Sequence, residues 1–268
     1  PSMREVHGFF DIDGDKLEYH LITPRQSRDT TLVFLHEGLG CVAMWKDFPR
    51  RVAEATGYPT LAYSRAGYGG STPCQRPRPI TFMHDEGLKV LPKVFAAAGI
   101  SQAILVGHSD GASIALINAG SDNDQRLRGL VLMAPHVFVE EELTVNSIRK
   151  AKSAYRATDL RERLARYHGD NVDHTFLSWV DAWLDESFLA WNIEEFLPSI
   201  SVPTLLIQGD EDNYGTLRQV EIINKHLPGG ADMFILPGCG HAPFREYPSE
   251  TLNAITDFLE KHQLLQPE

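Results

Sequence analysis

The chain has 268 residues, of which 43% are hydrophobic, and its 25 basic and 36 acidic side chains give a formal net charge of −11. This negative balance argues against binding to a nucleic-acid backbone or an anionic membrane surface, so we expect a small-molecule partner, no nucleic acid and no membrane. With no run of 18 apolar residues, no signal-peptide pattern and only three widely spaced cysteines, the chain is expected to be a reduced cytoplasmic protein, and its composition leaves the oligomeric state open.

The first predicted element is a β-hairpin. Residues 6–10 and 16–22 alternate apolar and polar side chains around the turn-forming pair Asp13-Gly14. Short apolar runs, typical of strands buried on both faces, then recur at residues 31–36, 60–63, 103–106, 130–133, 204–207 and 233–236. Helical patterns separate these runs. The chain is therefore predicted to be an α/β protein with a mostly parallel central sheet and helices on both faces.

Two of the helical patterns are especially clear. The first ends at Gly99 and places apolar side chains on one face at Leu88, Leu91, Val94, Phe95 and Ala98. The second begins at Pro248 and presents Leu252, Ile255 and Leu259 on one face. Both patterns predict helices packed on the sheet.

The alternation of strand and helix stops after Pro135. Residues 136–200 contain no convincing strand pattern but hold three of the four tryptophans. A structureless loop of this length is improbable inside a compact domain. We therefore predict a helical cap insertion over residues 136–200, within an α/β core formed by residues 1–135 and 201–268.

One helical face of the predicted cap is strongly apolar. It consists of Phe176, Val180, Trp183 and Leu184. Such a face either attaches the cap to the core or lines the substrate pocket, and Trp179 and Trp183 are the cap residues predicted to line the pocket.

A glycine-flanked serine follows the third of the six apolar runs. Residues 107–111 read Gly-His-Ser-Asp-Gly, between the buried strand predicted at 103–106 and the small, apolar helix start at 112–117. A serine in this setting sits on a tight strand-to-helix turn that exposes its hydroxyl as a nucleophile. Ser109 is therefore the candidate nucleophile.

A serine hydroxyl needs a base to take its proton and an acid to orient that base. His241 follows the last predicted strand through a flexible glycine-containing loop, which could bring its imidazole to the same edge of the sheet as Ser109. The acid is expected after the preceding strand, where Asp210, Glu211 and Asp212 lie in one turn. We choose Asp212, and expect the other two to be solvated loop charges.

Four motifs in this order resemble the capped α/β-hydrolases from about residue 5 to residue 265. They are YSRAGYGGS at 63–71, GHSDG at 107–111, QGDED at 208–212 and GCGHAPFREYP at 238–248. The resemblance implies an α/β-hydrolase fold and a catalytic triad of Ser109, Asp212 and His241, with the acid at the third position after Gly209. The chain order Ser, Asp, His is that of this family.

The resemblance also implies an oxyanion hole made of two backbone N–H groups. One is that of Asp110, directly after the nucleophile, and the other comes from the loop at 36–40, where Gly38 matches the donor position. Glu37 stands where the family usually has a glycine. This departure leaves Glu37 and Leu39 as alternative donors.

Two acidic side chains are thus expected beside the oxyanion, Asp110 and Glu37. Either Asp110 turns away and hydrogen-bonds to a neighbour, or the two carboxyl groups bind a polar or cationic substrate group, or one of them stays protonated. The pair His36-Glu37 lacks the second histidine of a zinc motif, because Gly40 stands in its place. We predict no metal and no cofactor.

Together these features predict a serine hydrolase that cleaves a small carboxylic ester or lactone through an acyl-enzyme on Ser109. Hydrolysis of a C–C bond in a β-diketone-like substrate would use the same residues, and a slow-turnover ligand receptor could share the fold. A basic stretch within residues 149–168 is either a solvated helical face or a surface that steers an anionic substrate.

Overall fold

A computed structural model describes residues 3–74, 77–121 and 125–265 of the chain. Within these ranges the strands form one eight-stranded sheet in the order β1-β2-β4-β3-β5-β6-β7-β8. The strands are β1 (Arg4–Ile12), β2 (Asp15–Thr23), β3 (Thr31–Leu35), β4 (Thr60–Tyr63), β5 (Ala103–His108), β6 (Leu127–Met133), β7 (Thr204–Gly209) and β8 (Asp232–Leu236). β1 pairs with β2 and β2 pairs with β4 in antiparallel register, whereas β3 to β8 are parallel to one another. The predicted α/β class, hairpin and parallel strands are confirmed.

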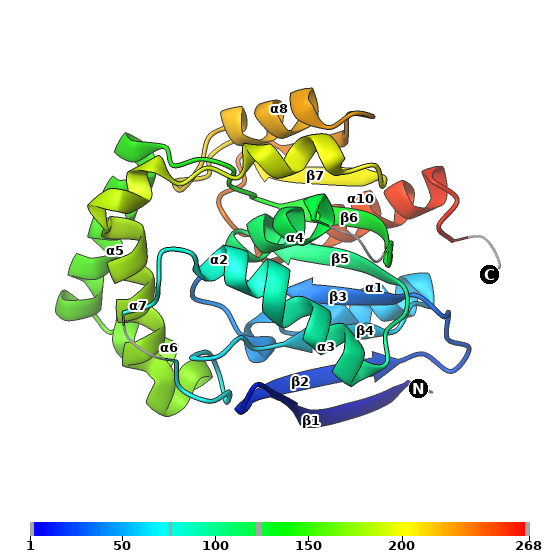
Figure 1. Cartoon of the computed structure of the whole chain (residues 1–268), viewed down its shortest axis with the longest axis horizontal. Helices are drawn as coiled ribbons and strands as arrows, with labels where there is room; N and C mark the ends of the chain where they lie inside the picture. The colour runs from blue at the N-terminus through cyan, green and yellow to red at the C-terminus, as the bar shows by residue number, and fades with distance from the viewer. Residues whose placement is uncertain (1–2, 75–76, 122–124, 266–268) are drawn as a thin grey trace.

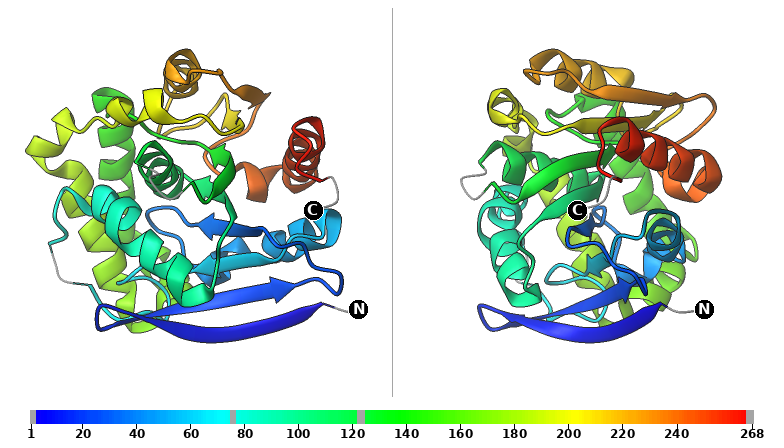
Figure 2. Two further views of the ribbon diagram at one scale, coloured as in Figure 1. Left: turned by 45° about the vertical axis from the view of Figure 1, so that its right-hand side comes forward. Right: turned by 90° about the vertical axis from the view of Figure 1, so that its right-hand side faces the viewer.

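The helices connect the strands and cover both faces of the sheet (Figures 1 and 2). The α-helices are α1 (Phe48–Thr56), α2 (Phe82–Asp85), α3 (Leu91–Ala98), α4 (Asp110–Gly120), α5 (Asn146–Ala157), α6 (Leu160–His168), α7 (Val172–Leu184), α8 (Leu217–His226), α9 (Pro243–Glu246) and α10 (Pro248–Lys261). Shorter 3₁₀ and π segments are η1 (Val42–Trp45), η2 (Glu86–Val90), η3 (Glu141–Val145), η4 (Gly169–Asn171), η5 (Glu186–Ala190) and η6 (Glu194–Ser199). No helix within the described ranges is both long and apolar enough to cross a membrane.

Alternate residues of the central strands enter two separate cores. On β3, Val33 and Leu35 pack with α3 and α4 on one face, whereas Leu32 and Phe34 pack with α1 and α10 on the other. All five residues of β3 are buried, as in a strand covered on both sides. This two-sided burial explains why the central strands appear in the sequence as uninterrupted apolar runs.

The prediction for Leu88 was wrong. This side chain is 41% exposed and lies in the π segment η2 instead of on the buried face of an α-helix. A π turn inserts one extra residue and rotates the positions that follow. Gly87 faces the core in its place, and a Cβ there would lie 3.0 Å from the carbonyl oxygen of Ile114 on α4. The close approach of η2 to α4 therefore selects glycine at this position.

Helices occupy the segment between β6 and β7. Among its described residues, β-type pairing is limited to one isolated antiparallel bridge between Phe138 and Asn192. Helices α5, α6 and α7 lie together at one end of the sheet (Figure 1). That end carries the carboxyl termini of the parallel strands, because α7 contributes Trp179 and Trp183 to a pocket beside Ser109. We refer to residues 136–200 as the helical insertion.

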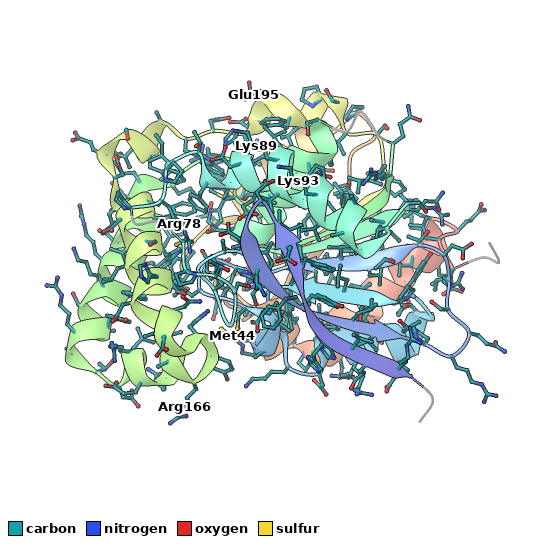
Figure 3. The ribbon with its side chains drawn as sticks, turned by 60° about the horizontal axis from the view of Figure 1, so that its bottom comes forward. Met44, Arg78, Lys89, Lys93, Arg166 and Glu195 are labelled. Carbon is teal, nitrogen blue, oxygen red and sulfur yellow. The ribbon has the colours of Figure 1, made fainter. Side chains whose placement is uncertain are left out.

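The N-terminal hairpin and the outer surface of the insertion lie away from this pocket. Lys93 of α3 forms an exposed ion pair with Asp13 at the hairpin turn. Arg166 of the basic stretch projects from the outer edge of the insertion (Figure 3). Arg161 and Arg163 of the same stretch pair with Asp173 and Asp159. The basic side chains are thus partly neutralised at the surface.

Candidate active site

Ser109 lies at a strained turn between β5 and α4. Its backbone has φ 54° and ψ −117°, a region that residues other than glycine rarely adopt. A Cβ at Gly107 would lie 2.6 Å from Cα of Ala112, and one at Gly111 would lie 2.0 Å from the carbonyl oxygen of Leu35. The two glycines therefore let the chain turn sharply enough to present the Ser109 hydroxyl at the end of the sheet.

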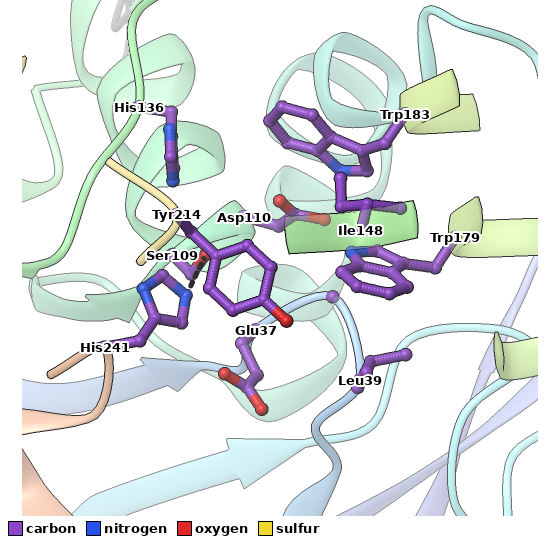
Figure 4. Close-up of a pocket in the computed structure, with 11 residues that line it drawn as sticks. Glu37, Leu39, Ser109, Asp110, His136, Ile148, Trp179, Trp183, Tyr214 and His241 are labelled. Carbon is purple, nitrogen blue, oxygen red and sulfur yellow. Dashed lines mark hydrogen bonds between the residues drawn. The ribbon is translucent and has the colours of Figure 1, made fainter. Parts of the chain in front are cut away.

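The structure brings Ser109, His241 and Asp212 into one hydrogen-bonded chain (Figure 4). Nε2 of His241 lies 2.9 Å from Oγ of Ser109, and Nδ1 lies 2.9 Å from Oδ2 of Asp212. Asp212 is fixed in turn by Nε2 of Gln208 at 3.0 Å and by the backbone N–H of Tyr214 at 2.8 Å. The imidazole is thus held at both nitrogens with its Nε2 directed at the serine.

The charges of Asp212 and His241 suit the imidazole of His241 to accept a proton. Burial opposes ionisation of Asp212, but the facing imidazole and the hydrogen bonds to the carboxylate hold its pKa well below the usual range. Burial likewise disfavours the imidazolium of His241, yet the Asp212 carboxylate raises the pKa of His241 above its ordinary value. An ionised Asp212 therefore stabilises the protonated imidazole that forms when His241 accepts a proton.

A pocket of about 80 Å³ opens next to the Ser109 hydroxyl. It is lined by Glu37, Gly38, Leu39, Ser109, Asp110, His136, Ile148, Trp179, Trp183, Tyr214 and His241. The pocket residues predicted from the sequence, Glu37, Trp179 and Trp183, are all among them. This set contains two carboxylates and no lysine or arginine, which favours a neutral or cationic ligand over an anionic one.

Gly38 and Asp110, the predicted oxyanion-hole residues, lie against each other in this pocket. A Cβ at Gly38 would lie 2.8 Å from Oδ2 of Asp110 and 2.5 Å from the Trp179 ring, so only glycine fits here. Asp110 is the first residue of α4, and the first N–H groups of a helix have no partner within it. The loop that holds Gly38 is fixed by Arg65, whose guanidinium donates to the carbonyl oxygens of His36 and Glu37.

The side chain of Asp110 points into the pocket, where the indole N–H of Trp183 partly offsets the effect of burial on the pKa of Asp110. It is 2% exposed, and its Oδ2 is buried without a hydrogen-bond partner in the described part of the chain. Burial raises the pKa of Asp110 to about 6. An unpartnered carboxyl oxygen in a ligand pocket costs free energy that a hydrogen-bond donor on a ligand would recover.

Three further residues belong to the site although the sequence analysis did not select them: His108, His136 and Tyr214. His136 lines the pocket with its Nδ1 buried and unpartnered among the described residues, and burial lowers its pKa to about 4. The ring of Tyr214 packs on His241 with centroids 4.7 Å apart. The sequence offered one signal for each of them, which is its position along the chain. His108 precedes Ser109, His136 follows strand β6, and Tyr214 lies two positions after Asp212.

His108, the residue before Ser109, connects two loops of the site. Its Nε2 lies 2.7 Å from the backbone carbonyl oxygen of His241, and its Nδ1 lies 3.4 Å from Oε2 of Glu37. Burial lowers the pKa of His108 to about 4. Burial opposes ionisation of Glu37, but His108 and His241 lower its pKa overall. A neutral imidazole therefore faces a carboxylate at neutral pH.

Comparisons with known proteins identify the family of this chain. The profile of the alpha/beta hydrolase family matches residues 32–255. The serine hydrolase BPHL of Mus musculus is 27% identical over 75% of this chain and 69% of its own length, and epoxide hydrolase 3 of Xenopus tropicalis is 21% identical over 98% of this chain and 80% of its own. The enol-lactonase of Burkholderia xenovorans LB400 superposes with a TM-score of 0.74 at 20% identity, over 94% of this chain and 99% of the lactonase.

Proposed function

The chain belongs to the alpha/beta hydrolase family, and from this premise we propose that it is a serine hydrolase of small carboxylic esters or lactones. The observation that carries the proposal is the contact between Nε2 of His241 and Oγ of Ser109 at 2.9 Å, with Asp212 behind the imidazole. A hydroxyl on a strained turn beside a base oriented in this way is equipped for nucleophilic attack on a carbonyl carbon.

The proposed reaction proceeds through an acyl-enzyme. Oγ of Ser109 bonds to the carbonyl carbon while Nε2 of His241 takes the hydroxyl proton, and the backbone N–H groups of Gly38 and Asp110 hold the oxyanion. His241 then returns the proton to the leaving alcohol oxygen as the C–O bond breaks. Water attacks the acyl-enzyme in a second step, with His241 again as the base, and releases the carboxylic acid and free Ser109. Asp212 orients His241 throughout.

The pocket favours a short acyl group that carries a hydrogen-bond donor. Its volume of about 80 Å³ is below the usual range for larger ligands. The buried, unpartnered Oδ2 of Asp110 accepts hydrogen bonds when ionised, and Glu37 adds a second negative charge. An ammonium or hydroxyl group near the scissile carbonyl would give Oδ2 of Asp110 a close hydrogen-bond donor, whereas a plain alkyl chain would not.

The remaining parts of the proposal concern organisation and context. We assign residues 136–200 as a cap that supplies Trp179 and Trp183, and residues 1–135 and 201–268 as the α/β-hydrolase core. Residues 1–2, 75–76, 122–124 and 266–268 of this core lie outside the described residues. The acidic net charge and the free thiols of Cys41, Cys74 and Cys239 support a cytoplasmic protein with a small-molecule substrate.

The test is active-site labelling followed by substrate profiling. A fluorophosphonate should attach to Ser109, as located by peptide mass spectrometry, and Ser109→Ala should abolish labelling. Ser121→Ala, at the far end of α4, is the matched control and should label normally. Labelling elsewhere, or none in folded protein, would overturn the serine assignment.

Turnover separates the proposed activity from its alternatives. A panel of p-nitrophenyl esters and lactones should give many turnovers per site, with the shortest acyl groups hydrolysed fastest. One burst without further turnover would indicate a receptor. Cleavage of β-diketones with inert esters would indicate C–C hydrolysis.

A further inference from the structure

Three side chains that can bind a metal ion converge next to Ser109 from separate loops. Glu37 follows β3, His108 ends β5, and His241 follows β8. One carboxylate oxygen of Glu37 and one nitrogen of each imidazole lie within 4.8 Å of one another. A modest movement of these side chains would bring all three atoms into the coordination sphere of a single ion.

The hydrogen bonding of His108 leaves a lone pair directed at Glu37. A carbonyl oxygen only accepts, so Nε2 of His108 must carry the hydrogen that it donates to the carbonyl of His241. In the neutral ring the lone pair is then on Nδ1, which lies 3.4 Å from Oε2 of Glu37. A cation between these two atoms would be bound by both, in place of the proton that an imidazolium would carry there.

His241 has the corresponding arrangement. Its Nδ1 is held by the Asp212 carboxylate, so Nε2 is the nitrogen whose lone pair a metal could take. Metal-binding imidazoles usually donate their second nitrogen to a carboxylate or a backbone carbonyl, which fixes the ring. Asp212 supplies this support to His241, and the carbonyl of His241 supplies it to His108.

We propose that Glu37, His108 and His241 form an inhibitory site for a divalent transition-metal ion of the zinc class. Two imidazoles and one carboxylate are a ligand set of zinc and its neighbours, whereas calcium and magnesium prefer oxygen ligands. Glu37 and His241 line the pocket, so an ion can reach the site from there. The bound ion occupies the lone pair of His241 that must receive the Ser109 proton, and the enzyme is inactive while the metal is bound.

Arg245 opposes this binding and offers a sensitive control. It lines a small cavity of about 10 Å³ on the same loops, together with Glu37 and His108. Its positive charge repels a cation in the proposed site, and its side chain is exposed. Removing that charge in Arg245→Gln should therefore tighten metal binding without removing a ligand.

Direct binding to the intact protein provides the test, because it needs no turnover. Equilibrium dialysis with zinc chloride should give one bound ion per chain. Cobalt(II) bound in its place should show the visible d–d absorption bands that are typical of a low coordination number. Zinc should inhibit ester hydrolysis and a chelator should restore it. Failure of the proposed activity would leave the dialysis and cobalt readouts intact, so the two proposals can fail separately.

Variants then locate the ion. His108→Gln keeps an N–H donor for the carbonyl of His241 but has no ring nitrogen, and it should weaken zinc binding by about 100-fold or more, since even outer partners of metal ligands are worth about 10–100-fold. Glu37→Gln should also weaken binding, and Arg245→Gln should strengthen it. His136→Gln alters another buried imidazole of the pocket and should bind zinc as the parent does. Absence of zinc binding in the parent, or equal affinity in the parent and His108→Gln, would overturn the proposal.

Discussion

Nε2 of His108 donates a hydrogen bond to the backbone carbonyl of His241 at 2.7 Å, although the two residues are 133 positions apart. This bond ties the residue before Ser109, the proposed nucleophile, to His241, the proposed base. It therefore helps to hold the distance between Ser109 and Nε2 of His241.

His108 should accordingly act as a positioning residue. His108→Ala removes the hydrogen bond to the histidine loop and should lower kcat by about tenfold, the rate equivalent of one such bond. His108→Gln supplies an amide N–H in a similar place and should recover most of the loss. Steady-state kinetics of metal-free protein check this, with circular dichroism to verify folding. Equal losses in the two variants would show that packing, not the hydrogen bond, matters.

Ser109→Ala should lower kcat by about 10⁴–10⁶-fold with the fold intact, by analogy with other triads. His241→Ala should cost a similar factor. The double variant should lose little more than either single variant, because nucleophile and base act as a unit. Ester hydrolysis by the three variants measures this, and multiplicative losses would contradict a shared role.

The two aspartates of the acid loop should differ sharply. Asp212→Asn removes the charge behind His241 and favours the wrong tautomer, so kcat should fall by about 10⁴-fold. Asp210 is exposed and accepts a hydrogen bond from the Gly238 backbone at 2.8 Å, away from the imidazole. Asp210→Asn should therefore lose less than about tenfold, the cost of a single neutral hydrogen bond. The opposite order would reassign the acid.

The pH dependence should reflect the raised pKa of His241. Catalysis needs the neutral imidazole, so kcat/KM should be low below this pKa and rise as pH increases through it. Because Asp212 favours the imidazolium, the midpoint should lie above the ordinary histidine value of 6.5. In Asp212→Asn, the pH midpoint of the remaining kcat/KM should move to a lower pH. A pH–rate profile with a neutral ester measures both, and a midpoint below 6.5 in the parent would contradict the expectation.

Asp110 should confer a preference for cationic acyl groups that depends on pH. Its pKa is raised to about 6, so the carboxyl is largely neutral at acid pH and becomes ionised as pH rises through that value. The p-nitrophenyl esters of glycine and propionic acid differ chiefly by an ammonium in place of a methyl group. The kcat/KM of the glycine ester divided by that of the propionic ester should increase between about pH 5 and 7, the interval around this ionisation.

Taking the ratio cancels the ionisation of His241, which affects both esters. Asp110→Asn keeps the backbone N–H but cannot ionise, and it should give a pH-independent ratio. A parent ratio that is flat with pH would mean that Asp110 does not contact the acyl group.

Features set by local chemistry could be predicted from the sequence. Apolar runs such as residues 103–106 form strands because both of their faces must be buried, and this requirement is visible without knowing their neighbours. The turn at Ser109 is partly local, because a Cβ at Gly107 would meet the backbone of Ala112, whereas glycine at 111 is required by Leu35 in the adjacent strand. Chain order then indicated which loops carry His241 and Asp212.

Other features depend on contacts between distant segments, and only the tertiary structure decided them. Leu88 became exposed because the approach of α4 favours glycine at the neighbouring position. Oδ2 of Asp110 lies in a pocket that is completed by Gly38 from one loop and by Trp179 and Trp183 from the insertion. The meeting of His108 with Glu37 requires two loops more than 70 residues apart to end at the same edge of the sheet. A residue's own sequence neighbourhood carries no record of such an encounter, because its energy belongs to the pair and exists only after folding.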